Sequence, residues 1–275
     1  MAKAISIKLL AAAGIFAALW FGQAPLSWLI AGIIALAALA LIGWGVFNVN
    51  SSLWARTLWR GLSDNTVALT FDDGPDERFT ARVLEILRGK DVKAAFFVVG
   101  SRAQKSPALL QRIKAEGHLV GNHSFTHAWN INFGLWGRLR REIAGCNDVV
   151  ESAIGQTPRF YRAPHGFKNP ALGDVLDRAG MVAVGWQIRG FDAVRGDAAA
   201  IARRVVEGAQ AGGVILLHDG GGLQGTDDRG ATLEALPVII DGLRARGFKL
   251  ARLDDLLGEG AYAARLAPQV TVGAT

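Results

Sequence analysis

The chain has 275 residues, of which 51% are hydrophobic and 20% are charged, and its formal net charge is +6. Its single cysteine, Cys146, excludes a disulfide scaffold and a cysteine-rich zinc site. A purely soluble protein is also excluded, because no charged residue occurs from Leu9 to Phe47.

This uncharged region contains two apolar stretches, residues 5–22 and 26–47, which are separated by a short segment around Pro25. The second stretch is long enough to cross the ~30 Å hydrocarbon core of a bilayer as a helix. Tryptophans lie near the ends of both stretches, where indole rings favour the membrane interface. We therefore expect residues 1–50 to form a membrane anchor of two transmembrane helices. The alternative is a signal peptide with its cleavage site at residues 22–24, but it leaves the second stretch unexplained.

Basic residues flank these stretches unevenly. Lys3 and Lys8 lie at the first stretch, Arg56 and Arg60 follow the second, and the segment between the stretches carries no charge. The positive-inside bias then places both ends of a helical hairpin in the cytoplasm of a bacterial-type inner membrane. The rest of the chain would face the same reducing side, in agreement with its lack of disulfides. If only residues 26–47 span, the rest of the chain faces the opposite side.

Residues 51–63 combine large apolar side chains with two arginines. This pattern predicts a juxtamembrane amphipathic connector. It either lies against the membrane or packs on the domain that follows.

From Thr66 onward, short apolar runs alternate with longer amphipathic ones. Strands are predicted at residues 67–71, 94–99, 119–121, 159–161, 182–186, 214–217 and 248–251. Helices are predicted at residues 80–88, 107–116, 135–154, 169–179, 198–211 and 232–246. The alternation indicates an α/β fold of parallel βα units, closed or nearly closed into a barrel. We expect this barrel over residues 64–257 and a C-terminal tail over residues 258–275.

Polar motifs follow most of the predicted strands. They occupy residues 70–75, 122–127, 162–166, 192 and 218–219. Because the carboxyl ends of parallel strands meet at one rim of a barrel, we expect these side chains to converge on one site.

Two histidines in this set point to a metal. His123 and His127 are four residues apart, which places both imidazoles on one face if the segment turns helically. Two histidines and one carboxylate form a usual ligand set for a catalytic divalent ion with an open position. Asp73 is the natural third ligand. A histidine pair alone is more often structural, but the neighbouring Asp-Asp pair favours the metal site.

The remaining polar residues suggest proton transfer. Asp72 can accept a proton, and Arg162 could pair with Asp72 and orient it. His218 ends an apolar run and is well placed to protonate a leaving group, while Asp192 could hold its imidazole. The alternatives are an acidic turn at residues 72–75 and a satisfied core histidine at position 218.

Together these residues resemble the polysaccharide deacetylase family, also called the NodB homology domain or carbohydrate esterase family 4, over about residues 64–257. The resemblance implies a distorted (β/α)7 barrel that follows the N-terminal transmembrane helical hairpin. It implies one divalent metal ion, zinc or else cobalt or manganese, on Asp73, His123 and His127. It also implies that Asp72 is the general base, His218 the general acid, Arg162 the residue that orients the base, and Asp192 the acid that tunes His218.

The resemblance further implies a substrate-binding role for Pro164, His165, Trp186 and Leu217. Three positions depart from the family pattern. His165 replaces a tyrosine whose backbone N–H contacts the oxyanion, and Ala193 replaces a tryptophan that walls the acetyl pocket. Arg189 replaces an acidic residue, which puts a cation near the site and argues against a long neutral glycan as substrate.

We therefore expect a membrane-anchored, metal-dependent deacetylase that hydrolyses N-acetyl groups of an amino sugar, in a lipid-linked, phosphate-bearing glycan. The alternatives are a peptidoglycan or exopolysaccharide deacetylase on the outer side, and a deformylase of a lipid-linked amino sugar. A catalytically silent carbohydrate-binding membrane protein would lack Asp72 or a metal ligand, and none is lost. Partners are the glycan and the membrane, and nucleic acid is not expected because no basic and aromatic cluster occurs. The sequence leaves the oligomeric state open.

Overall fold

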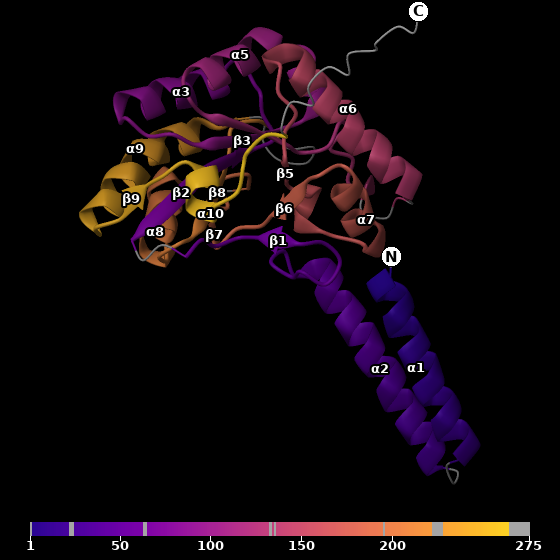
Figure 1. Ribbon diagram of the computed structural model, residues 1–275. Helices are drawn as coiled ribbons and strands as arrows, with labels where there is room; N and C mark the ends of the chain where they lie inside the picture. The colour runs from indigo at the N-terminus through magenta and orange to yellow at the C-terminus, as the bar shows by residue number, and fades with distance from the viewer. Residues whose placement is uncertain are drawn as a thin grey trace, which may run out of the picture.

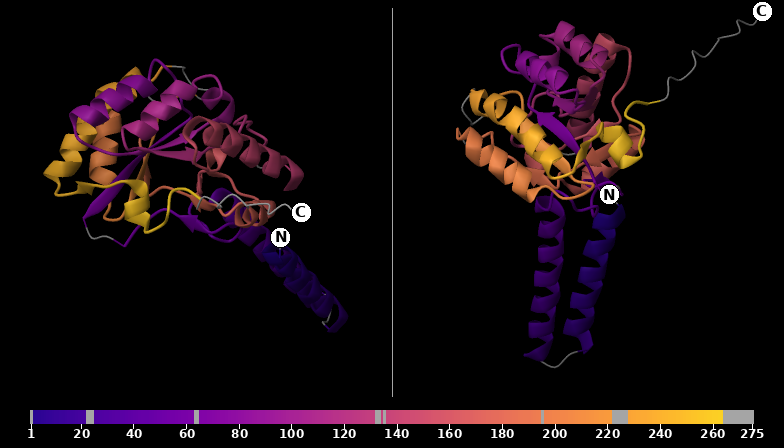
Figure 2. Two further views of the ribbon diagram at one scale, coloured as in Figure 1. Left: turned by 45° about the horizontal axis from the view of Figure 1, so that its top comes forward. Right: turned by 90° about the vertical axis from the view of Figure 1, so that its left-hand side faces the viewer.

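The computed structural model describes residues 2–21, 25–62, 65–131, 134, 136–194, 196–221 and 228–263. Two apolar helices, α1 (Ala2–Phe21) and α2 (Leu26–Phe47), project side by side from an α/β domain (Figure 1). Both views of Figure 2 show the start of α1 and the end of α2 at the domain, with the end of α1 and the start of α2 far from it. That connection, residues 22–24, lies outside the described residues.

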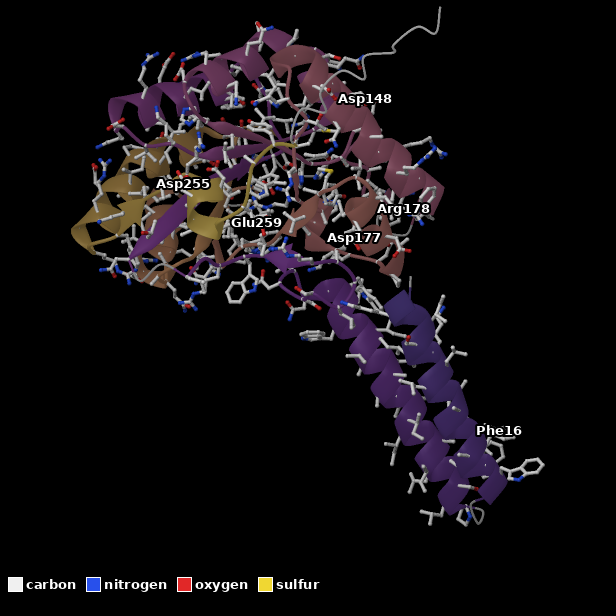
Figure 3. All side chains as sticks on the ribbon, viewed as in Figure 1. Phe16, Asp148, Asp177, Arg178, Asp255 and Glu259 are labelled. Atoms are coloured by element: carbon white, nitrogen blue, oxygen red, sulfur yellow. The ribbon has the colours of Figure 1, made fainter. Side chains whose placement is uncertain are left out.

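The two helices pack on each other and leave most of their large side chains on the outside. A Cβ atom added at Gly14 of α1 would lie 3.2 Å from Cδ1 of Ile34 in α2. Phe16, labelled in Figure 3, projects away from the helix pair and stacks on Trp20 at 5.5 Å. By length and composition, α2 can cross a membrane, whereas the apolar part of α1, Ile5–Trp20, is shorter. The N-terminal region thus contains one helix consistent with a membrane span or signal anchor.

The domain is built on a curled sheet in which the paired strands are parallel. The strand order is β1-β6-β5-β4-β3-β2-β8-β7, and β9 pairs with the first residues of β2. The strands are β1 (Thr57–Leu58), β2 (Thr66–Asp72), β3 (Ala95–Val98), β4 (Leu119–Asn122), β5 (Phe160–Tyr161), β6 (Val182–Val184), β7 (Ile188–Arg189), β8 (Val214–His218) and β9 (Lys249–Leu250). The α/β half-barrel agrees with the fold expected from the sequence.

Helices surround the outer face of this sheet (Figure 1). They are α3 (Thr80–Gly89), α4 (Gly100–Ala103), α5 (Pro107–Ala115), α6 (Trp136–Ile154), α7 (Pro170–Arg178), α8 (Ala198–Gly208), α9 (Gly230–Ala245) and α10 (Leu253–Leu257), with a 3₁₀ turn at Pro164–Gly166. Side chains alternate along each strand. In β2, Leu69 and Phe71 therefore join the core between sheet and helices, whereas Ala68 packs inside the barrel.

The described residues of the connector pack on the barrel. Thr57 and Leu58 form β1 and pair with β6, and Trp54 is only 5% exposed. Helix α7 lies directly against this segment, since a Cβ atom at Gly173 would come within 2.1 Å of the Trp54 carbonyl oxygen. A two-residue strand is too short to produce a period-2 pattern, which is why the sequence did not reveal it.

The barrel also extends past its expected end at residue 257. The backbone N–H of Val120 donates to the Tyr262 hydroxyl at 3.0 Å, and that of Arg159 donates to the carbonyl of Ala261 at 2.9 Å. Residues 258–263 are therefore part of the domain. The rest of the expected tail, residues 264–275, lies outside the described residues.

Candidate active site

The carboxyl ends of the parallel strands surround one pocket of about 640 Å³. Strand β2 supplies Asp72, β8 supplies His218, and the segment after β4 supplies both metal-candidate histidines. The pocket is lined by Asp72, Asp73, His123, His127, Trp129, Ala163, His165, Gly166, Trp186, Arg189, Phe191, Ala193, Val194, Leu216 and His218. Residues that are far apart in the sequence are thus brought together by the convergence of the strand ends.

Asp73, His123 and His127 form a compact buried cluster. Oδ1 of Asp73 lies 3.2 Å from Nε2 of His127 and 3.5 Å from Nε2 of His123. One ligand atom from each of the three residues lies within 4.8 Å of the others. Each of the three residues is less than a tenth exposed. The cluster therefore has the composition and size of a site for one divalent cation.

The donor set fits a cation at this point. Nδ1 of His123 lies 2.8 Å from the carbonyl oxygen of Arg162, which can only accept, so Nδ1 carries the proton. Nε2 is then unprotonated and faces Asp73. In metal sites a backbone carbonyl often fixes a histidine in this way and leaves the other ring nitrogen to bind the ion. Burial opposes a charge on His123, but the carboxylates of Asp72 and Asp73 still raise its pKa. The site thus favours positive charge between these atoms.

A loop, not a helix, brings the two histidines together, which corrects the helical expectation. Ser124 and His127 have φ values of 67° and 53°, in the left-handed region. The backbone N–H of Ser124 donates to Oδ1 of Asn122, and that of His127 donates to Oγ of Ser124. These local bonds satisfy the loop backbone and place the imidazole centroids 4.8 Å apart.

Asp72 is held by a fully buried arginine. Nη1 of Arg162 lies 2.7 Å from Oδ1 of Asp72 and 2.8 Å from Oγ1 of Thr70. The remaining guanidinium donors reach the carbonyl oxygens of Val184 and Gly185. Because every side of the guanidinium is occupied, Asp72 has one fixed orientation toward the pocket.

His218 is held by Asp192, which is itself held by Thr232, a residue that the sequence did not indicate. The backbone N–H of His218 donates to Oδ2 of Asp192 at 2.7 Å, and Nδ1 lies 3.0 Å from Oδ1. Thr232 donates its hydroxyl to Oδ2 of Asp192 at 2.9 Å. Burial lowers the pKa of His218, but the Asp192 carboxylate outweighs it and raises the pKa to about 9. The Asp192 contact therefore favours the protonated imidazole of His218 at neutral pH.

The residues expected to bind substrate divide into two groups. Trp186 and His165 line the pocket, whereas Pro164 is buried and does not. Leu217 is a correction: it is fully buried in the core beneath the helices, and its neighbour Leu216 lines the pocket. The reason is strand alternation, because His218 and the residue two positions before it share one face of β8.

Two exposed apolar residues at the pocket were missed by sequence reasoning. Trp129 is 62% exposed and Val194 is 76% exposed. Trp129 follows His127 by two residues, so its position in the same loop was the signal that could have found it.

Comparison with known proteins decides the family. Residues 60–184 match the family model described as polysaccharide deacetylase. The chain is 32% identical over 197 residues to a peptidoglycan-N-acetylglucosamine deacetylase of Bacillus cereus, which covers 71% of this chain and 89% of that protein. The chain belongs to the polysaccharide deacetylase family. It is also 37% identical over 202 residues to a chitooligosaccharide deacetylase of Rhizobium leguminosarum bv. trifolii, covering 70% of this chain and 92% of that protein.

The fold of this polysaccharide deacetylase is likewise similar to that of a solved relative. A peptidoglycan N-acetylglucosamine deacetylase in complex with 4-naphthalen-1-yl-N-oxidanyl-benzamide matches with a TM-score of 0.68 and 31% identity, covering 75% of this chain and 95% of that one. The chain is accordingly a hydrolase of the metal-dependent carbohydrate N-deacetylase class. The Asp73, His123 and His127 cluster fits that class.

Metal content tests the cluster directly. We expect the purified polysaccharide deacetylase to bind one divalent ion per chain, and Asp73→Ala, His123→Ala and His127→Ala each to lower the bound metal, because each removes one donor atom. Elemental analysis of dialysed protein measures this. His165→Asn is the matched control, since the His165 ring lies 5.1 Å from that of His127 but outside the cluster. Full metal content in His127→Ala would overturn the assignment.

Proposed function

We propose that this polysaccharide deacetylase is membrane-anchored and removes N-acetyl groups from an amino sugar in a lipid-linked glycan. The observation that carries the catalytic part is the pairing of an oriented carboxylate, Asp72, with a protonated imidazole, His218, in the pocket that holds the metal-candidate cluster. Amide hydrolysis needs both, because one proton leaves the attacking water and another must reach the departing amine.

In this proposal Asp72 is the base and His218 is the acid. Asp72 takes a proton from the attacking water on Oδ2, because Oδ1 is occupied by Arg162. His218 carries its proton to the amine through Nε2, because Nδ1 is held by Asp192. Both groups thus enter the reaction in a fixed orientation, with no rearrangement of their partners.

Asp73, His123 and His127 would hold the divalent ion, which we propose is zinc. When bound, the ion polarises the amide carbonyl and the attacking water as a Lewis acid. The donor set of two imidazoles and one carboxylate suits zinc, and it also admits cobalt or manganese.

The proposal of a lipid-linked substrate rests on the position of the pocket beside the apolar helix α2. Nδ2 of Asn50 donates to the carbonyl oxygen of Trp186, a pocket residue, at 3.1 Å. The rings of Phe47, at the end of α2, and Phe167, beside the pocket wall, lie 5.4 Å apart. If α2 spans the bilayer, these contacts keep the pocket close to the membrane surface. A sugar carried on a lipid reaches such a pocket more readily than a distant polymer does.

A second candidate is favoured by the relatives. The B. cereus protein is named a peptidoglycan-N-acetylglucosamine deacetylase, and that of R. leguminosarum a chitooligosaccharide deacetylase. A peptidoglycan deacetylase on the outer side requires the opposite orientation of the domain. A deformylase of a lipid-linked amino sugar would use the same proton-transfer groups.

Assays with both kinds of substrate test the function. The metal-loaded full-length protein should remove acetyl groups from isolated lipid-linked N-acetylated glycans, read by mass spectrometry, while peptidoglycan should react more slowly. Loss of formyl would assign the deformylase instead. Asp72→Asn should keep the metal and lose roughly 10²–10⁴-fold in rate, the usual contribution of general acid–base catalysis. Loss of metal in Asp72→Asn would make Asp72 a ligand, and faster reaction of peptidoglycan would favour the second candidate.

The pH dependence of the rate tests the role of His218. A general acid must be protonated, so activity should fall as the pH rises through the pKa of His218, which is about 9. Asp192→Asn removes the carboxylate that raises this pKa, so the alkaline limb of the rate profile should move to lower pH. Asp197→Asn is the control, because Asp197 only caps α8 by accepting from the backbone N–H of Ala200. An unmoved alkaline limb in Asp192→Asn would remove His218 from this role.

Orientation is tested by a reporter fused after Thr275. With Lys3 and Lys8 at one helix and Arg56 and Arg60 after the other, the positive-inside bias predicts a two-span hairpin with a cytoplasmic domain. A reporter that is active only in the periplasm should then stay silent, and one that is active only in the cytoplasm should give signal. Strong periplasmic signal would reject the hairpin and favour the outer-side candidate.

A further inference from the structure

Two arginines flank one aromatic ring at the rim of the catalytic pocket. The guanidinium carbon of Arg189 lies 4.0 Å from the centroid of the Phe191 ring, and that of Arg204 lies 4.3 Å from the same centroid. Nε of Arg204, on α8, also donates to the carbonyl oxygen of Arg189, on β7, at 3.1 Å. Two like charges are therefore held at one place by the ring and by a backbone contact.

No carboxylate of the described residues forms an ion pair with either guanidinium. The nearby acids are engaged elsewhere. Asp192 holds His218, and Asp197 caps the first turn of α8. Burial, followed by the charge of Arg204, lowers the pKa of Arg189. The pair thus forms a local excess of positive charge with which no described carboxylate pairs.

Among the described residues, Nε of Arg204 has an acceptor, whereas the Nη donors of both arginines remain available to a ligand. A guanidinium carbon this close to a ring centroid places the cation over the ring, and the N–H groups that the ring does not contact can still donate. Arg189 and Phe191 line the same pocket as Asp72 and His218, and both arginines are exposed. Planar, forked guanidinium donors suit the oxygen atoms of a phosphate group.

We propose that Arg189, Arg204 and Phe191 form an anion subsite that binds a phosphate or diphosphate ester on the glycan substrate. The subsite selects glycans that carry phosphate over neutral glycans for the adjoining reaction. This inference rests on the proposed function in one respect, that the substrate is an N-acylated amino sugar.

A matched pair of substrates tests the subsite. One is N-acetylglucosamine joined to a short isoprenyl chain through a diphosphate, and the other is the same sugar joined to the same chain by a neutral glycosidic bond. The full-length enzyme should show a higher kcat/KM for the diphosphate compound. Arg189→Gln and Arg204→Gln should each reduce that preference roughly 10- to 100-fold, as expected for losing charge-assisted hydrogen bonds. Salt should weaken the preference of the wild-type enzyme as well.

Arg203→Gln is the control, because Arg203 is an exposed neighbour on the same helix without a stacking contact to Phe191. It should keep the preference of the wild-type enzyme. Equal kcat/KM for both compounds in the wild type, or an undiminished preference in Arg189→Gln and Arg204→Gln, would overturn the subsite while leaving the deacetylase assignment intact.

Binding gives a readout that does not depend on turnover. N-acetylglucosamine 1-phosphate, titrated calorimetrically into the metal-loaded protein, should bind roughly tenfold or more weakly to Arg189→Gln than to the wild type and to Arg203→Gln. Equal binding to all three proteins would overturn the subsite. If neither compound of the pair is hydrolysed, the proposed function fails, and the calorimetric comparison still decides the subsite.

Discussion

The buried guanidinium of Arg162 is the interaction on which the rest of the active site depends. It lies over the Phe97 ring, 4.1 Å from its centroid, and donates to Asp72 and Thr70 on β2. The carbonyl oxygen of the same residue accepts from Nδ1 of His123. One residue therefore orients the proposed base with its side chain and a proposed metal ligand with its backbone. Removing one member of a buried ion pair costs about 3–5 kcal/mol, so a substitution that truncates Asp72 or Arg162 would disrupt this arrangement, whereas the isosteric Asp72→Asn keeps an acceptor for Arg162.

The alternation of side chains along each strand then determines which of them face the catalytic pocket. Along β8, Ile215 and Leu217 join the core under the helices, whereas Leu216 and His218 face the pocket. Because the side-chain period of a strand is two, a register shift of one residue would bury His218 in that core. The strong apolar packing of Leu217 therefore fixes the direction in which His218 points.

The sequence predicts the barrel and the site well wherever the signal is a strand followed by a polar motif. The expected polar motifs do lie at strand ends, and Asp73, His123 and His127 lie together. Prediction from the sequence fails where a strand is very short, or where a contact joins residues that are far apart in the sequence. Strands β1 and β7 have two residues each and were not predicted, whereas β5 and β9, of the same length, were predicted because they lie in the apolar runs at residues 159–161 and 248–251. The contact of Thr232 with Asp192 joins residues 40 positions apart, so no local pattern could indicate it.

The junction between the apolar helices and the domain is itself held by an unusual buried charge. Lys168 is 2% exposed, and its Nζ atom donates to the carbonyl oxygens of Val49 and Ser51 at 2.7 and 2.6 Å and to Oγ1 of Thr57 at 3.1 Å. Among the described residues it has no carboxylate partner, and burial lowers its pKa to about 8. An ammonium group in such a place is stable only while these oxygens surround it. A domain cut free before Ser51 would lose the Val49 carbonyl and the Asn50 contact with Trp186, both beside the pocket wall. The segment that directly follows α2, residues 48–51, is therefore packed into the domain that carries the pocket.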